Sequence, residues 1–299
     1  TAVIAIKDVS DAILWSWHVW VTDEDINNVI EITNHQNVKY NFMPVNLGQC
    51  DGNTITYEER SCKVKFIAGD QSKEITIKQL ANVIATGSNA PFYQWGRKDP
   101  LYPSNGMGNT TKIWYDKEGI PSTANPMKGT FSAGNDCIKN CILNPNLMHN
   151  RYNGDYTYYN LWSADNKTTS ANDNPVNKTI YDPCPVGFKL PASNAFTGFT
   201  TTGESVSSST QVNGTWSSSE KGWYFYTNSE KTQSIFFPAL GYRSYSTMRP
   251  GSIGTQGCFW SAHPVAKGNN YYLRTSSVDV QPTYMVDRGF GYALRPCQD

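Results

Sequence analysis

The sequence predicts a β-dominated α+β fold with short helices and long loops. Six short segments rich in Trp, Tyr and Phe follow one another between residues 214 and 295, and turn-rich loops of Gly, Asn, Ser and Thr separate them. Aromatic runs bounded by turn residues are typical of β-strands. Patterns compatible with a helix are confined to three brief stretches, near residues 22–30, 135–143 and 193 onward.

Charge and hydropathy exclude two classes of partner. The 299 residues carry 25 basic and 25 acidic side chains without a like-charge run, so the basic footprint of a nucleic-acid binder is absent. No apolar run approaches the roughly 18 residues that cross a bilayer. Aromatic residues at 13% with charged residues at only 17% favour an uncharged, hydrogen-bonding surface, as in extracellular β-proteins and carbohydrate binders.

The N-terminal segment predicts a strand at residues 2–6 and a second, more apolar strand at 13–21. Trp15 and Trp17 lie two residues apart and therefore on one face of that strand. We expect it to be a central strand of the core. His18 lies beside Trp17, and because no nucleophile signature accompanies it, we expect a hydrogen-bonded core histidine.

A short amphipathic helix is predicted at residues 22–30. Thr22 and the acidic residues after it suit a helix N-terminus, and apolar residues follow at spacings of three and four. The same oxygen-rich cluster could bind calcium. It lacks the alternating ligands and closing Glu of an EF-hand loop, so helix capping is the preferred interpretation.

We expect one domain over residues 1–299, with a β-hairpin embellishment at about 50–85. Alternating apolar residues at 64–67 and 74–78 flank a loop that contains Gly69, which is typical of a hairpin. The Gly- and Pro-rich segment around residues 100–130 predicts a long loop.

Further along, residues 135–143 predict a helix with Asn135 or Asp136 as its cap, and Ser193 is a candidate cap for another. Cys137 and Cys141 would then lie one turn apart, which is poor geometry for a bridge between them.

Residues 181–191 predict a rigid connector, because three prolines fix φ and Gly187 permits a positive φ. Cys184 in this connector and Cys297 in the terminal strand are the most constrained cysteines, so we predict that they are bridged or within bridging distance. Cys50 and Cys62, which bracket a loop, are the second candidate pair. Seven cysteines favour export, although an odd number leaves at least one of them unpaired. A structural zinc site is not indicated, because the sequence contains no Cys-x2-Cys pair.

Six segments, in order along the chain, resemble the Fibrobacter succinogenes major paralogous domain, which is found in fimbrillin-like surface proteins of gut Bacteroidetes. They are residues 13–23, 42–48, 93–100, 181–188, 237–243 and 288–297. That family is similar to the C-type-lectin-like fold, so the resemblance implies such a fold here. It also implies an exported adhesin at the cell surface or on a fimbria. Because the chain begins with Thr1 and not Met, any signal peptide or lipid-attachment cysteine would lie upstream of it.

The leading functional hypothesis is a non-enzymatic binding module, without cofactor or metal, for a host or microbial glycan or protein and for other fimbrial subunits. Loop aromatics are suited to stacking on sugar rings and protein surfaces. The candidates are Trp223, Tyr245 and Tyr284. No complete calcium motif of sugar-binding C-type lectins is present, since Gln281-Pro282 is followed by Thr283. We therefore expect binding that does not need calcium.

Two alternatives remain open. A structural pilus subunit that assembles by strand exchange would need an exchangeable terminal strand, and only residues 2–6 could serve. An oxidase similar to the formylglycine-generating enzymes would need a reactive thiol, for which Cys258 is the nearest candidate, but no partner cysteine stands close to it in the sequence. A serine hydrolase is not indicated, because Gly-x-Ser-x-Gly is absent.

Overall fold

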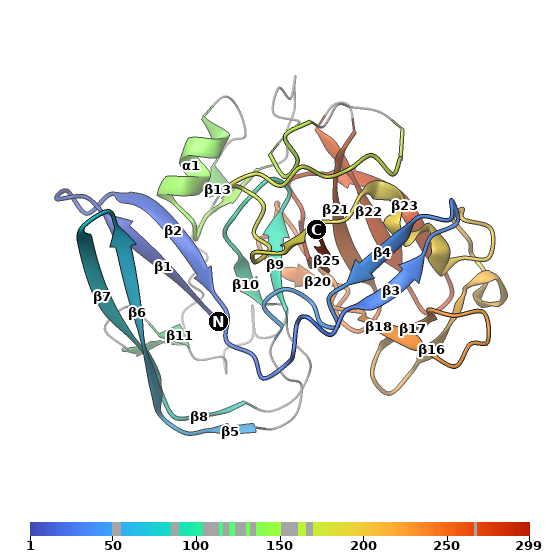
Figure 1. The fold of residues 1–299 in the computed structure, drawn as a ribbon, viewed down its shortest axis with the longest axis horizontal. Coiled ribbons are helices and arrows are strands. Elements are labelled where there is room, and N and C mark those ends of the chain that lie inside the picture. The colour runs from blue at the N-terminus through green and yellow to red at the C-terminus, as the bar shows by residue number, and fades with distance from the viewer. Residues whose placement is uncertain are drawn as a thin grey trace.

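The computed structural model is drawn in Figure 1. The residues that it describes are 1–49, 55–84, 90–103, 114–115, 120–122, 130–131, 136–150, 161–165, 170–265 and 268–299. Strands dominate these residues, which confirms the β-rich α+β fold class. The helical segments in the described ranges are α1 (Cys137–Leu143) and two short 3-10 helices, η1 (Ser193–Phe199) and η2 (Ser209–Gln211).

Two three-stranded antiparallel sheets hold the aromatic runs of the C-terminal part. Their pairing sets aromatic residues opposite one another, for example Trp223 between Trp216 and Phe237. Such cross-strand aromatic pairs stabilise a sheet beyond the area they bury. The first sheet is β16 (Gly214–Ser217), β17 (Gly222–Tyr226) and β18 (Ser234–Pro238), and the second is β21 (Gly257–Pro264), β22 (Asn269–Thr275) and β23 (Val280–Asp287).

Two further sheets join the two ends of the chain. In one of them β4 pairs with the terminal strand β25, and in the other β9 pairs with β24. Strands β4 and β9 therefore complete their sheets only when the last residues of the chain are in place. The first sheet is β15 (Phe188–Lys189), β25 (Cys297–Gln298), β4 (Lys39–Phe42) and β3 (Ile30–Thr33), and the second is β10 (Leu101–Pro103), β9 (Pro91–Gln94), β24 (Gly291–Tyr292), β19 (Tyr242–Arg243) and β20 (Pro250–Gly251).

Two small strand pairs and helix α1 lie between these sheets in sequence. Helix α1 begins after Asp136, as predicted, although Asp136 makes no side-chain capping hydrogen bond. The 3-10 helix η1 includes Ser193 as its first residue, so Ser193 is not its cap. The strand pairs are β11 (Trp114–Tyr115) with β12 (Pro121–Ser122) and, in parallel, β13 (Thr130–Phe131) with β14 (Met148–His149).

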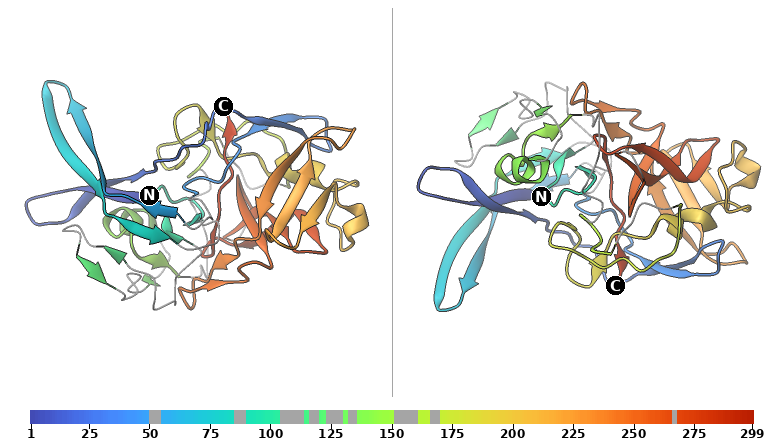
Figure 2. Two further views of the ribbon diagram at one scale, coloured as in Figure 1. Left: turned by 90° about the horizontal axis from the view of Figure 1, so that it is seen from below. Right: turned by 90° about the horizontal axis from the view of Figure 1, so that it is seen from above.

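Two long hairpins project from the body of the molecule, as Figure 2 shows. The predicted hairpin at about 50–85 is present, with nine residues paired in each arm and a second short pair at its base. Its tip turns at Gly69, where φ is +63°. The hairpin strands are β1 (Ala2–Lys7) with β2 (Ile13–Val19), and β6 (Arg60–Ala68) with β7 (Gln71–Gln79), the latter extended by β5 (Ile55–Tyr57) with β8 (Asn82–Ile84).

The prediction that the tryptophan-rich strand is central to the core is wrong. Strand β2 pairs only with β1 in the described residues, and a two-stranded ribbon buries little of its surface. Trp17 is 36% exposed, with its ring 5.2 Å from that of Phe66 on the other hairpin. Both faces of β2 contact the body of the molecule. On one face Ser16 donates to Asp99, and on the opposite face the Trp15 ring lies 4.4 Å from Lys98 Nζ. His18 Nδ1 lies 2.8 Å from the Tyr93 hydroxyl, which confirms a hydrogen-bonded histidine.

The predicted helix at 22–30 is also wrong. The Thr22 hydroxyl accepts a hydrogen bond from the backbone N–H of Glu24, and the Asp25 carboxylate accepts one from that of Asn27. Bonds of this kind over two residues form turns that compete with a helix. The segment consists of bends and turns, and strand β3 begins at Ile30.

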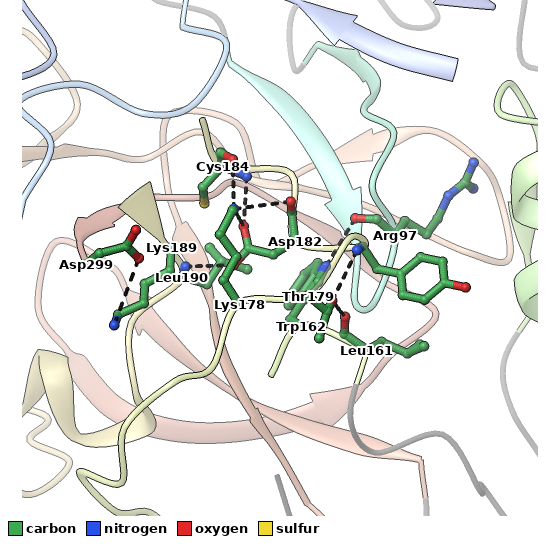
Figure 3. Close-up of polar contacts among 11 residues, drawn as sticks. Arg97, Leu161, Trp162, Lys178, Thr179, Asp182, Cys184, Lys189, Leu190 and Asp299 are labelled. Atoms are coloured by element: carbon green, nitrogen blue, oxygen red, sulfur yellow. Dashed lines mark hydrogen bonds and ion pairs between the residues drawn. The ribbon is translucent and has the colours of Figure 1, made fainter. Parts of the chain in front are cut away.

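Asp182 organises the proline-rich connector, as Figure 3 shows. Its carboxylate accepts backbone hydrogen bonds from Cys184 at 2.8 Å and Leu190 at 3.1 Å, and it pairs with Lys178 Nζ at 2.6 Å. Gly187 has φ +82°, the positive value predicted for this turn. One fully buried carboxylate thus joins the start and the end of the connector.

Replacing the Asp182 carboxylate should destabilise the connector and with it the folded protein. We expect Asp182→Asn to lower the free energy of unfolding by about 3 to 5 kcal/mol, because an amide leaves Lys178 without its counter-charge and presents a donor to one of the two N–H groups that donate to the carboxylate. Urea unfolding measures the change. Asp299→Asn is the matched control, since its ion pair with Lys189 spans 3.9 Å with Asp299 half exposed, and a loss below about 0.5 kcal/mol is expected. Equal losses in both variants would contradict this role.

Candidate binding surface

Trp223 cannot contact a ligand, which corrects the first of the three predicted binding residues. It is 1% exposed, and its indole N–H donates to the Ser276 carbonyl at 2.7 Å. The residue belongs to β17, the middle strand of its sheet, so neighbours cover it from both sides. Its ring packs against those of Trp216 and Phe225, both at 5.9 Å.

Tyr245 and Tyr284 are joined by an unbroken series of ring contacts. Tyr245 lies against Phe290 at 5.0 Å, and Phe290 against Tyr292 at 5.9 Å. Tyr292 lies against Tyr272 at 4.6 Å, which in turn contacts Tyr284 at 5.7 Å. We call these five residues the tyrosine chain. Its members come from β22, β23, β24 and the loops beside β19 and β24, so only the folded protein assembles them.

The tyrosine chain is buried in the middle and reaches the surface at its ends. Tyr272 and Tyr292 are 4% and 3% exposed, and their hydroxyls hydrogen-bond each other. Burial raises the pKa of both phenols, so each remains neutral at any physiological pH. At one end Tyr284 is 45% exposed, and at the other Tyr245 and Phe290 are half-buried. The rings of Tyr284 and Phe290 therefore pack against Tyr272 and Tyr292, which burial holds in place.

A cation and an apolar side chain accompany Tyr284. The guanidinium carbon of Arg274 lies 5.9 Å from the centre of the Tyr284 ring, and Gln281 orients Arg274 through a hydrogen bond of 3.0 Å. Met285, the next residue of β23, is 49% exposed. Tyr and Arg together are typical of contact hot spots in protein interfaces.

Two buried arginines hold the loops that carry the other end. Arg243 donates to the Met248 carbonyl at 2.8 Å and so closes the loop that contains Tyr245. Arg288, whose guanidinium lies 4.1 Å from the Trp95 ring, donates to the carbonyls of Asn269 and Val265. Both arginines are fully buried. Sequence reasoning grouped Arg243 and Arg288 in motifs but did not assign them this positioning role.

Neither the thiol considered from the sequence, Cys258, nor the hydroxyl of Ser193 is accessible. Cys258 is 1% exposed, and burial raises its pKa to about 12, so it is a protonated core thiol. A pair that sequence reasoning did not consider as a nucleophile and base brings the Ser193 hydroxyl within 3.2 Å of His263 Nδ1. Both residues are buried to 1% exposure or less, so a substrate could not reach the hydroxyl. Their separation of 70 residues left no local signal.

The predicted Cys184–Cys297 bridge is not formed in the structure, and the alternative that the two residues lie within bridging distance stays a prediction. Both residues are buried free thiols, and they pack in different hydrophobic clusters of the core. Burial raises the pKa of Cys184 well above its usual value and that of Cys297 to about 12. In the second predicted pair Cys50 lies outside the described residues, and Cys62 is an exposed free thiol on β6.

No group of three or more His, Cys, Asp or Glu side chains that could hold a metal ion occurs in the described part of the chain. None of the helices described there combines the length and apolar character needed to cross a membrane. Comparisons with known proteins add no assignment: no protein-family model matches the chain, and no curated protein or solved structure is significantly similar to it. The resemblance drawn from the sequence motifs stays a prediction.

Truncating Trp223 should therefore cost stability. We expect Trp223→Ala to lower the free energy of unfolding by about 3 to 5 kcal/mol, because it leaves a large cavity beside Trp216 and Phe225 and removes the bond to Ser276. Urea unfolding followed by circular dichroism measures the loss. Tyr224→Ala, on the same strand but half-exposed, should cost clearly less. A Trp223→Ala variant as stable as the wild type would contradict the buried position.

Acidification should destabilise the protein. Burial lowers the pKa of His18 and of His263 to about 4, against about 6.5 in an unfolded chain. Between these values the unfolded chain binds more protons than the folded protein, so the free energy of unfolding falls as the pH falls from 6.5 to 4. Urea unfolding at about pH 7 and about pH 5 measures the drop.

A pair of variants isolates the contribution of a buried histidine. His263→Gln, which cannot take up a proton, should show a smaller drop in stability between the two pH values than the wild type. The exposed His35 provides the control, and His35→Gln should retain the full drop. Identical drops in the two variants would show that His263 does not contribute.

Proposed function

We propose that this chain is a non-enzymatic binding module of an exported surface protein. It contacts a glycan or a protein partner through the two ends of the tyrosine chain. The observation that carries the proposal is the continuous series of rings from Tyr245 to Tyr284, which is buried at its centre, exposed at Tyr284 and half-buried at Tyr245. Neither Cys258 nor Ser193 supports catalysis, because both are buried.

Such an arrangement favours binding for an energetic reason. Exposed tyrosines lose little conformational entropy on contact and offer an apolar ring together with a hydroxyl, so they serve both protein surfaces and sugar rings. The buried rings beneath Tyr284 fix its base before a partner arrives, which reduces the ordering cost of association. Arg274 adds a cation that can orient a polar partner.

The proposed setting is an adhesin at the cell surface or on a fimbria, as the motif resemblance implies. Other fimbrial subunits are then further partners. One observation favours the second candidate, a structural subunit that assembles by strand exchange: β1 pairs with β2 alone among the described residues, and Val3 and Ile6 on it are 41% and 46% exposed. An edge strand with exposed apolar side chains is suited to pairing with another chain.

Truncating the tyrosine at either end of the tyrosine chain should weaken binding. On an array of glycans and host proteins, we expect Tyr284→Ala or Tyr245→Ala to reduce affinity by about 1 to 3 kcal/mol, the range for a contact hot spot. Tyr224→Ala is the matched control, since this half-exposed tyrosine lies on β17 and contacts Glu220 and Phe236, outside the tyrosine chain. It should retain wild-type affinity.

Chelation completes the test. Binding should persist in EDTA, because no cluster of metal-binding side chains is found in the described residues. A signal that EDTA abolishes would contradict calcium-independent binding. Full affinity in both tyrosine variants would place the contact on another face of the molecule, and for the strand-exchange candidate deletion of residues 1–7 would abolish assembly while leaving array binding intact.

A further inference from the structure

A polar cleft of about 400 Å³ opens beside the edge strand β3. One wall is Ile32 and Thr33 of β3, and the opposite wall is formed by Asn213 and by the end of β17 with the loop after it. Figure 1 shows β3 beside the sheet of β16, β17 and β18. Every lining side chain is uncharged, and none belongs to the tyrosine chain.

Several polar groups of the cleft remain available to a ligand. The Asn213 side-chain amide donates to the carbonyls of Gly198 at 3.1 Å and Tyr226 at 3.3 Å, which leaves its Oδ1 as an acceptor. The hydroxyls of Thr33 and Thr227 make no hydrogen bond within the described residues. An acceptor of fixed direction and two rotatable hydroxyls thus line one space.

The wall after β17 is held rigid by its own hydrogen bonds. The Asn228 side-chain oxygen accepts from the backbone N–H groups of Thr232 and Gln233, each at 3.0 Å, and its amide donates to the Thr232 hydroxyl at 2.7 Å. The Tyr226 hydroxyl is fixed at 2.6 Å from that of Thr215. Because these bonds exist without a ligand, the cleft is largely preformed.

We propose that this cleft is a binding site for a neutral saccharide. Its volume falls within the range of small-molecule sites, and hydroxyl and amide groups pair with sugar hydroxyls without a buried charge. The half-buried ring of Tyr226, with the Lys231 ammonium 5.6 Å from its centre, supplies an apolar surface for a sugar ring. The side chains that line the cleft carry no charge themselves, and an extended peptide would find no apolar pocket, because Ile32 is only 2% exposed.

The test uses the whole chain and three neutral disaccharides, maltose, cellobiose and lactose, with binding followed by saturation-transfer NMR and calorimetry. At least one should bind the wild type. We expect the double variant Thr33→Val, Thr227→Val to bind it at least about tenfold more weakly, since both substitutions keep side-chain shape and remove a hydroxyl. Thr283→Val, a half-buried threonine of β23 outside the cleft, is the control and should bind like the wild type.

The remaining outcomes decide against the site. Absence of binding for all three disaccharides, or unchanged binding in a double variant that unfolds at the wild-type temperature, overturns the proposal. If the double variant does not fold, the single variant Thr227→Val, at a half-exposed loop position, carries the same expectation. Tyr284→Ala should leave disaccharide binding intact, so failure of the cleft and failure of the tyrosine chain are distinguishable. Loss of disaccharide binding in Tyr284→Ala would overturn the assignment to the cleft.

Discussion

The buried guanidinium of Arg295 is the constraint on which the rest of the structure depends. It donates to the carbonyls of Met43, Pro44 and Phe236 and to Asn46 Oδ1, at 2.7 to 3.1 Å, and lies 4.5 Å from the Phe237 ring. A buried cation is tolerated only when its donors are satisfied, so these partners must converge on it. The terminal segment, the segment after β4 and strand β18 are fixed together in this way.

This convergence explains why both candidate sites depend on the pairing of strands from the two ends of the chain. Strand β9 pairs with β24, which precedes Arg295 by a few residues. Strand β4 pairs with β25, which follows Arg295 by a few residues. The tyrosine chain then assembles over β24, while the cleft lies at β3, the outer strand of the sheet that holds β25. Both proposed contact regions thus rest on sheets that the chain ends close together, and neither is carried by the projecting hairpins.

The wrong predictions for Trp223 and for the tryptophan-rich strand have a common physical origin. Trp223 was predicted to lie near a loop, but β17 gained partners on both sides and became the middle of a sheet. The strand at residues 13–19 was predicted to be central, but it gained one partner and remained half exposed. Burial depends on how many neighbours a strand acquires, and those neighbours are distant in sequence. For residues 22–30 the error was local, since Thr and Asp serve turns as well as helix caps.

By itself the sequence determined what short-range chemistry decides. Aromatic runs between turn residues specified the strands near 214–217 and 222–226, proline and Gly187 specified the rigid connector, and alternation specified the hairpin at β6 and β7. Tertiary structure alone decided which aromatic rings are exposed, that Tyr245 and Tyr284 are linked through Tyr272 and Tyr292, and that Thr33 and Asn213 face one cleft. These residues are 12 to 180 positions apart in the sequence, and the pairing of the strands into sheets brings them together.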